Sequence, residues 1–381
     1  MSVPKPDGAT TDSTPADDAT AETFHSLTEI AHRAKANLTQ GVWDYVAGAT
    51  ETETTLRRNR LAIDRLAFRP RVLRDVSIVD VESTFLGRPT RLPVFIAPVG
   101  QLTHLTQNGA ADVAAAAAEF GIPQFHSSGS PPKLEEVAEV SSDLTRIFQL
   151  YATGDTGYVD GYVQRAEAAG CHGFCLTVDT AWYSRRERDI LNRWGRRWES
   201  AGFGAGSEAL AALSWADVER IRANTSMPLI LKGIATSEDA RLAVEHGVDV
   251  VYVSNHGGRQ LDHGLGSLDV LPEVVEAVGA EASVFVDGSF MRGTDVLKAV
   301  ALGADAVGLG RVACLGLAAA GPSGLVRVLE LIEDEMRRSI GLLGATSLDQ
   351  LDPSFVTTAS VVSEPHMLSA FPLLDQGYLH D

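Results

Sequence analysis

The chain has 381 residues, of which 45% are hydrophobic, enough for one large domain or two of ordinary size. Its net charge of −18 argues against nucleic acid or an anionic membrane surface as the main partner. No apolar run reaches about 18 residues, so we expect no transmembrane helix. The three cysteines are too sparse for a disulfide framework and show no zinc-type pairing. We therefore expect no metal site and a protein of the reducing cytoplasm.

The N-terminal part divides into two segments of different composition. Residues 1–21 are rich in Asp, Thr, Pro and Ala and lack the basic start and apolar centre of a signal peptide. We expect a disordered acidic tail there. Residues 22–90 carry helical patterns, including GVWDYVAGATETETTLRRNRLAIDRL at 41–66. This second segment is expected to be helical and to pack on the domain that follows.

From residue 91 to 345, short apolar runs alternate with helix-like segments, several of which end in glycine. This alternation predicts parallel βαβ units, and eight units predict an α/β fold of the closed (β/α)₈ TIM-barrel type. An open doubly wound sheet is the alternative, but no G-x-G-x-x-G follows the first strand. Residues 346–381 are expected to form a C-terminal tail. The runs expected as strands are 92–98, 123–128, 145–151, 173–179, 228–234, 248–254, 282–288 and 305–311.

One long segment interrupts this alternation of predicted strands and helices. Residues 185–212 lie between the fourth predicted strand and its helix. Long loops at such positions are usually lids or binding loops, so we expect this one to border the site.

Polar side chains gather at the predicted carboxyl ends of the strands, where barrel active sites form. Each of them alone would be weak evidence, because a lone histidine or lysine is more often an ordinary surface or core residue. Their convergence on one face of the barrel predicts an active site. The strand ends in question are Ser127–Ser128, Gln149–Tyr151, Thr177–Asp179, Lys232–Gly233, Ser254–His256, Asp287–Gly288 and Gly310–Arg311.

The last two strand ends favour a phosphorylated ligand. VDGSFMRG and GLGR follow the seventh and eighth predicted strands, where barrels commonly bind phosphate. Glycine lets backbone N–H groups approach an anion, and Arg311 can bind it through two parallel hydrogen bonds. The alternative is that these glycines only make turns.

The stretch SNHGGRQLD, at 254–262, places a histidine, two glycines and an arginine at one strand end. With FQLY, LTVDT, LKGI and GLGR, it resembles the FMN-dependent 2-hydroxy acid oxidases and dehydrogenases, which include glycolate oxidase, lactate monooxygenase and mandelate-oxidising enzymes. The resemblance runs from about residue 25 to 345 and includes WDYVAGATETETTLRRNR and RPRVLRDV. It implies FMN as the cofactor and a small 2-hydroxy acid as the substrate.

The resemblance also implies roles for individual residues. His256 matches the catalytic base, and Asp179 matches the carboxylate that orients it and stabilises its protonated form. Tyr151 matches a tyrosine whose hydroxyl meets the substrate oxygen. Arg186 could be replaced in its role by the adjacent Arg185, and Tyr45 could simply pack in a helix. The substrate-binding residues so implied are Tyr45, Gly129, Tyr151, Arg186, His256 and Arg259.

The cofactor-binding residues are implied in the same way. Lys232 matches a lysine beside the flavin N1 and O2 atoms, where negative charge grows on reduction. The residues implied around the ring system and ribityl chain are Pro98, Val99, Gly100, Ser127, Gln149, Thr177 and Ser254. Those implied around the phosphate are Asp287, Gly288, Ser289, Gly310 and Arg311.

Three departures from the family pattern bear on function. The family's D-G-G-x-R-R-G loop is replaced by residues 287–293, with Met291 at a position usually held by a phosphate-binding arginine. Arg292 is the alternative source of the charge, but its side chain is expected to point differently, so FMN binding is expected to be weaker by about 1–3 kcal/mol unless Arg292 compensates. Gly129 stands where glycolate oxidases have tryptophan, and the loop after the fourth strand is shorter than in most relatives. Both predict a substrate larger than glycolate.

We therefore expect oxidation of an (S)-2-hydroxy acid, bulky or aromatic, with O₂ as the acceptor. The alternatives are a dehydrogenase that passes electrons to a quinone or a protein, an oxidase that tailors a natural-product intermediate, and a flavin-binding protein without catalysis. The resemblance also implies a homo-oligomer, by analogy a tetramer.

Overall fold

The computed structural model describes residues 24–194 and 208–379, and the tail predicted at 1–21 lies outside them. Its centre is a closed barrel of eight parallel strands in the order β10-β11-β4-β5-β6-β7-β8-β9. The pairing of β4 with β11, with Val94 opposite Val307, closes the ring and rules out the open sheet. The strands are β4 (Val94–Ile96), β5 (Gln124–Ser127), β6 (Arg146–Leu150), β7 (Gly173–Thr177), β8 (Leu229–Ile234), β9 (Val250–Val253), β10 (Ser283–Val286) and β11 (Ala306–Leu309).

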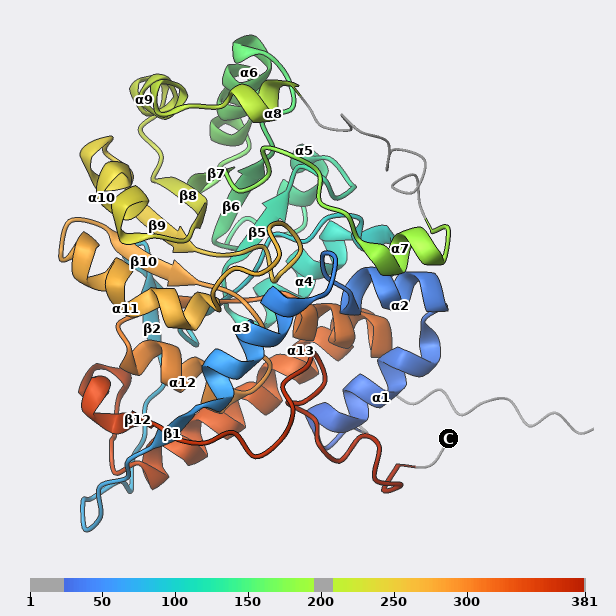
Figure 1. The fold of residues 1–381 in the computed structure, drawn as a ribbon. Coiled ribbons are helices and arrows are strands. Elements are labelled where there is room, and N and C mark those ends of the chain that lie inside the picture. Colours follow the sequence, from blue (N-terminus) through green and yellow to red (C-terminus); the bar gives the residue numbers. More distant parts are fainter. Residues whose placement is uncertain (1–23, 195–207, 380–381) are drawn as a thin grey trace, which may run out of the picture.

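Helices surround this barrel, as Figure 1 shows. Each predicted strand is present, because continuous apolar runs suit strands that are buried on both faces. The helices between and after the strands are α4 (Ala110–Phe120), α5 (Leu134–Ala138), α6 (Thr156–Ala168), α7 (Glu187–Leu191), α8 (Glu208–Ala212), α9 (Trp215–Asn224), α10 (Ser237–Glu245), α11 (Ser267–Val278), α12 (Gly293–Ala301) and α13 (Arg311–Leu342).

The long helix α13 is kinked at Ala320 and Gly321, where the backbone leaves the helical conformation. It has the length and apolar composition of a membrane span, but 67% of its most apolar stretch is buried inside the protein. α13 packs against α1 and α4, as expected for a core helix.

The segment before the barrel begins with helices α1 (Leu27–Asn37), α2 (Gln40–Ala47) and α3 (Thr54–Asp64). The prediction of helix over the whole of 22–90 is wrong beyond Asp64. There the chain forms β1 (Leu66–Phe68) and a hairpin of β2 (Ser83–Phe85) and β3 (Arg88–Thr90). Local sequence did not indicate β1, because its partner β12 (Val356–Thr358) comes almost 300 residues later in the chain.

The C-terminal segment is thus part of the fold rather than only a tail. Besides β12, it includes the short 3₁₀ turns η3 (Leu348–Gln350) and η4 (Pro353–Phe355); another such turn, η2 (Leu102–His104), follows β4. Phe355 and Phe371 are buried.

The barrel interior is packed with aromatic side chains. Phe85 from the β2–β3 hairpin lies among Phe95, Phe125 and Phe285, with ring centroids 4.9 to 6.2 Å apart. Polar residues follow the carboxyl ends of the strands, the end of a barrel where active sites form.

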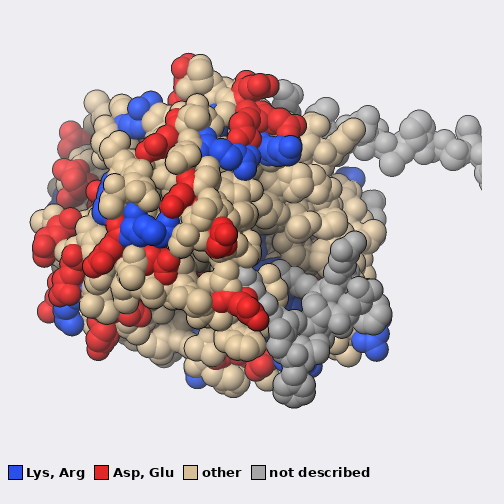
Figure 2. Space-filling model, turned by 90° about the horizontal axis from the view of Figure 1, so that it is seen from above, with Lys and Arg blue, Asp and Glu red and all other residues tan. Residues whose placement is uncertain are grey.

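The outer surface reflects the acidic composition. Figure 2 shows acidic side chains spread over much of one face, with lysine and arginine only in small groups. Four cations, in contrast, line the cavity at the carboxyl ends of the strands: Arg186, Lys232, Arg259 and Arg311.

Candidate active site

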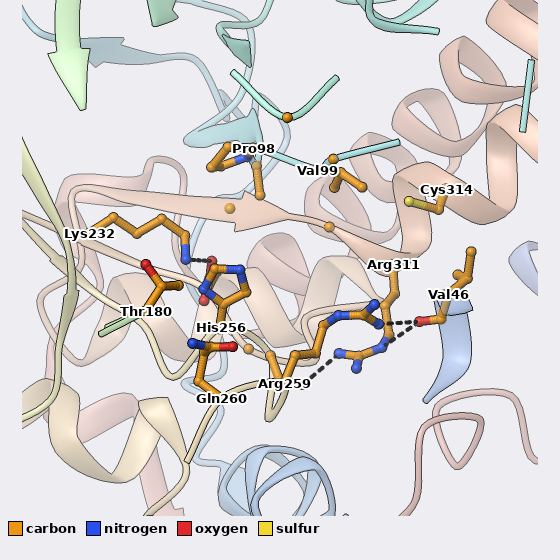
Figure 3. A pocket seen from close by; sticks show the side chains of 18 of the residues that line it. Val46, Pro98, Val99, Thr180, Lys232, His256, Arg259, Gln260, Arg311 and Cys314 are labelled. Carbon is orange, nitrogen blue, oxygen red and sulfur yellow. Dashed lines mark hydrogen bonds and ion pairs between the residues drawn. The ribbon is translucent and has the colours of Figure 1, made fainter. Parts of the chain in front are cut away.

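A cavity of about 310 Å³ lies at the carboxyl ends of the barrel strands. Part of it is shown in Figure 3. The predicted site residues that line it are Tyr45, Pro98, Val99, Gly100, Gly129, Tyr151, Arg186, Lys232, His256, Arg259, Asp287, Gly288, Ser289, Gly310 and Arg311. The other predicted site residues, Ser127, Gln149, Thr177, Asp179 and Ser254, lie behind this lining and hydrogen-bond to one another or to residues of the lining.

His256 is held from both ring nitrogens. Its Nδ1 lies 3.1 and 3.2 Å from the two carboxylate oxygens of Asp179, and its Nε2 lies 3.1 Å from the Tyr151 hydroxyl. Burial and the positive charge of Lys232 lower the pKa of His256, although Asp179 opposes this shift. Burial opposes ionisation of Asp179, but its interactions with His256, including the hydrogen bond, and the positive charge of Lys232 outweigh burial and lower the pKa of Asp179. The pair is therefore a neutral imidazole beside a carboxylate, ready to accept a proton.

The two residues after His256 are glycines because a larger side chain would clash with neighbouring atoms. His256, Gly257 and Gly258 all have positive φ angles, of 59°, 64° and 76°. A Cβ atom at Gly258 would come within 2.6 Å of the Leu56 backbone nitrogen, and one at Gly257 within 2.7 Å of Arg311 Nη1. Glycine is required because the turn is left-handed and lies directly against α3 and the arginine.

Helix α3 locks this turn through a pair of amide side chains. Asn59 Nδ2 donates to Asn255 Oδ1 at 2.8 Å, and Asn255 Nδ2 donates back to Asn59 Oδ1 at 2.7 Å. Asn59 Oδ1 also accepts from the Ser267 backbone N–H at 2.9 Å. Asn59 is fully buried, so the pre-barrel helix fixes the residue next to His256.

The guanidinium groups of Arg259 and Arg311 lie side by side at the C-terminal end of α2 (Figure 3). Arg259 Nη1 donates to the carbonyl oxygens of Tyr45 and Gly48, at 2.5 and 3.0 Å. Arg311 donates to those of Val46, Gly48 and Gly257, at 2.9 to 3.0 Å. The negative end of a helix dipole favours cations here, which stabilises two neighbouring positive charges in one cavity.

The structure also decides between the two neighbouring arginines. Arg186 is buried and lines the cavity, whereas Arg185 is exposed and its carbonyl oxygen accepts hydrogen bonds from Thr50 and Glu51. Tyr45 lines the cavity as well: its hydroxyl donates to the Gly100 carbonyl at 3.0 Å. Both substrate-binding candidates therefore line the cavity, and their role in binding the substrate stays a prediction.

Lys232 belongs to a buried polar group on neighbouring strands. Its Nζ lies 2.9 Å from Ser254 Oγ and 3.9 Å from Asp287 Oδ2. Asp287 also accepts hydrogen bonds from Ser254 and Tyr252, at 2.6 and 2.8 Å. Burial opposes the charge of Lys232, but Asp287 and Asp179 outweigh it and raise the pKa of Lys232. A fixed positive charge therefore stands at this strand end.

Some cavity residues were not found by sequence reasoning. Gln260 lines the cavity and donates to the Asp179 carbonyl at 3.0 Å; its place directly after Arg259 was a usable signal. Cys314 lies one helical turn after Arg311, and burial raises its thiol pKa to about 11. Thr180 and Leu210 also line the cavity; Thr180 ends the LTVDT motif, whereas no motif marked Leu210.

The FMN-dependent dehydrogenase family model matches residues 34–358. The chain is 39% identical over 355 residues to an L-lactate oxidase from a Nostoc species. The aligned region covers 87% of this chain and 97% of that oxidase. Glycolate oxidase from Spinacia oleracea is also 39% identical, over 87% of this chain and 95% of that enzyme.

The fold agrees with these sequence matches. A crystal structure of mandelate oxidase superposes with a TM-score of 0.82 at 39% identity and covers 90% of this chain and all of that one. The chain belongs to the FMN-dependent dehydrogenase family. It is an FMN-dependent oxidoreductase of 2-hydroxy acids.

The residues of the cavity fit FMN. Gln149 Oε1 and Ser289 Oγ are buried and have no hydrogen-bond partner among the described residues. Buried polar atoms of this kind usually have a partner, and a flavin ring or its phosphate offers one. Gly288, with φ of 121°, keeps the loop clear of Ser267 and Asn59. These residues would hold FMN, with Lys232 beside it as the fixed positive charge.

Replacing Asn59 tests the lock on the His256 turn. Asn59→Ala leaves the Ser267 N–H buried and unpaired, and it removes two hydrogen bonds from the Asn255 amide, which keeps the Leu265 carbonyl and the Gly258 N–H as partners; we therefore expect a loss of about 1–3 kcal/mol in the free energy of unfolding. Urea unfolding followed by tryptophan fluorescence measures this. Asn108→Ala is the matched control, because Asn108 pairs with Asp112 at an exposed site. Equal effects of the two variants would contradict the role of Asn59.

The lowered pKa of His256 predicts the pH dependence of turnover. A base with a lowered pKa stays neutral further into the acid range, and its activity is lost only as pH falls through that pKa. We expect kcat/KM for the 2-hydroxy acid to decline on the acid side with an apparent pKa below about 6.5. In Asp179→Asn this limb should move to still lower pH, because the carboxylate that favours the imidazolium is gone. An acid limb well above 6.5 in the parent enzyme would refute this assignment.

Proposed function

We propose that this enzyme oxidises an (S)-2-hydroxy acid with a bulky or aromatic side chain to the 2-oxo acid, with O₂ as the electron acceptor. The observation that carries the proposal is Gly129. It lines the cavity beside Tyr151, and the absence of a side chain leaves space next to the predicted position of the substrate.

The space at Gly129 can hold a side chain. A Cβ atom built there would lie 3.5 Å from Ser127 Oγ and 3.8 Å from Gly100 Cα and the Tyr151 ring, which are ordinary contact distances. Tyr183, half-exposed, and Leu210 add apolar surface to the cavity lining. Among the solved relatives are mandelate oxidases with (S)-mandelic acid and with (S)-4-hydroxymandelic acid. A phenyl group on the substrate would gain a few kcal/mol from burial at about 25 cal/mol per Å².

The proton chemistry is assigned to His256. Its neutral imidazole accepts a proton from the substrate, and Asp179 stabilises the imidazolium that results. The Tyr151 hydroxyl, 3.1 Å from His256 Nε2, is placed to bind the substrate oxygen. FMN, when bound, accepts the two electrons released as the hydroxyl carbon becomes a carbonyl.

The carboxylate of the substrate is assigned to the cations beside His256. Arg259 lies three residues after the base, its guanidinium 4.9 Å from the centre of the Tyr45 ring. Arg186 lies on the same cavity and its charge acts on His256. A guanidinium can bind a carboxylate through two parallel hydrogen bonds, which would orient the hydroxyl carbon toward the base.

O₂ as the acceptor is supported by the relatives named as oxidases, from Nostoc, maize, spinach and rice. A cytoplasmic location and a homo-oligomer, by analogy a tetramer, stay predictions from the sequence.

Flavin reduction and reoxidation test the proposal directly. The purified holoenzyme is mixed without oxygen with glycolate, lactate or mandelate, and bleaching of the flavin absorbance is followed. Mandelate should bleach it with the highest ratio of the reduction rate constant to the substrate Kd. Dissolved O₂ should then reoxidise the flavin at a higher rate than a soluble quinone at the same concentration. Faster reoxidation by the quinone would favour the dehydrogenase alternative.

Filling the space at Gly129 should reverse the substrate preference. Gly129→Trp is expected to lower kcat/KM for mandelate by about tenfold or more, because the indole occupies the space of the phenyl group. Activity on glycolate should change little. Gly129→Ala is the matched control, since one methyl group fits at contact distance and should preserve the order. A tryptophan variant that still prefers mandelate would show that Gly129 does not border the substrate.

A further inference from the structure

One part of the cavity is bounded by the loop after β10, residues 287–291, and by Gly310–Arg311 at the start of α13. Backbone N–H groups at a helix N-terminus suit an anion. Here the anion is the terminal phosphate of FMN, predicted for these two loops from the sequence. The charges around this part of the cavity therefore determine how strongly the phosphate is bound.

An apolar side chain forms one wall of this phosphate site. Met291 is fully buried and lines the cavity. Its backbone N–H donates to Asp295 Oδ2 at 2.9 Å. The same carboxylate pairs with Arg60, which in turn donates to the Ser289 carbonyl at 3.2 Å. Asp295 and Arg60 thus fix the backbone of the loop, and the Met291 thioether side chain lines the cavity.

The two nearest arginines of the sequence are engaged elsewhere. Arg292 pairs with Glu335 at 2.5 Å and donates to the Ala370 carbonyl, and it is not part of the cavity lining. Arg60 is buried between Asp64 and Asp295. Neither supplies a charge to the phosphate site.

Arg311 is then the cation of this site. Three backbone carbonyls hold its guanidinium, which has five N–H groups, so two remain for a ligand. Burial and the adjacent Arg259 lower the pKa of Arg311 to about 9, and Arg311 pairs with no carboxylate in the described parts of the chain. A buried cation without a paired carboxylate favours an anionic ligand, although the more distant charges of Glu53 and Asp287 offset part of its charge.

A neutral donor stands beside it. Ser289 is buried and lines the cavity, and its hydroxyl has no hydrogen-bond partner within residues 24–194 and 208–379. Its φ of 65° is a strained value for a residue with a side chain. Such strain tends to be kept where the residue has a function.

We propose that one charge, on Arg311, and one neutral side-chain donor, the Ser289 hydroxyl, hold the phosphate of FMN, with Met291 as an apolar wall. The adjacent Arg259 is assigned to the substrate carboxylate under the proposed function, so Arg311 is the one cation left for the phosphate among the described residues, and the phosphate adds little to the affinity for the flavin. The protein should therefore bind FMN only about 10- to 100-fold more tightly than riboflavin, which lacks the phosphate.

Flavin titrations test this without reference to turnover. Protein freed of its cofactor is titrated with FMN and with riboflavin, and quenching of flavin fluorescence gives each Kd. Met291→Arg supplies a second cation and should tighten FMN binding about tenfold or more, with riboflavin binding unchanged. Ser289→Ala should weaken FMN binding several-fold, again without effect on riboflavin. Met291→Leu is the matched control and should leave both constants unchanged.

The outcomes separate the proposal from a structural effect. If Met291→Arg does not fold, as judged by circular dichroism, Met291→Gln offers a neutral donor and should shift FMN binding in the same direction by a smaller factor. Equal changes for FMN and riboflavin in Met291→Arg or in Ser289→Ala would overturn the proposal. So would a parent protein that prefers FMN more than a thousandfold, or a folded Met291→Arg variant with unchanged affinity for FMN.

Discussion

The site depends on one left-handed turn that packs against α3, a helix that precedes the barrel in the sequence. Residues 256–258 take positive φ angles and place the imidazole of His256 over the cavity. Such a turn is strained and persists only where its surroundings hold it. The holding groups come from α3: the Leu56 backbone, which leaves no room for a Cβ at Gly258, and the Asn59 side chain, which pairs with Asn255. The pre-barrel helices are therefore part of the catalytic scaffold.

The electrostatics of the site follow from burial. The chain is acidic overall, yet four cations face the cavity. Arg259 and Arg311 are accommodated together because the carbonyl groups at the end of α2 accept their hydrogen bonds. Inside a cavity of low dielectric these charges attract anions strongly. Burial, together with the charges of Lys232 and Arg186, lowers the pKa of His256. The proposed carboxylate binding and the proposed general-base function therefore both depend on burial.

Long-range pairing accounts for what sequence reasoning missed. The strand Leu66–Phe68 was assigned to a helical segment because its partner, Val356–Thr358, lies at the other end of the chain. Gln260 and Cys314 could have been noticed from their neighbours, Arg259 and Arg311. Asn59 could not, since nothing local in RRNR shows that an amide will meet Asn255 across the fold.

The sequence by itself determined the eight strands, the barrel and the residues that end each strand, because apolar periodicity and turn-forming glycines are local properties. It also carried the motifs that indicate a flavin enzyme of 2-hydroxy acids. Only the tertiary structure decided that Arg186 rather than Arg185 faces the cavity, and that Arg292 turns away to Glu335. Adjacent side chains of the same type are equivalent in sequence. They differ only once backbone direction and neighbouring carboxylates fix where each charge points.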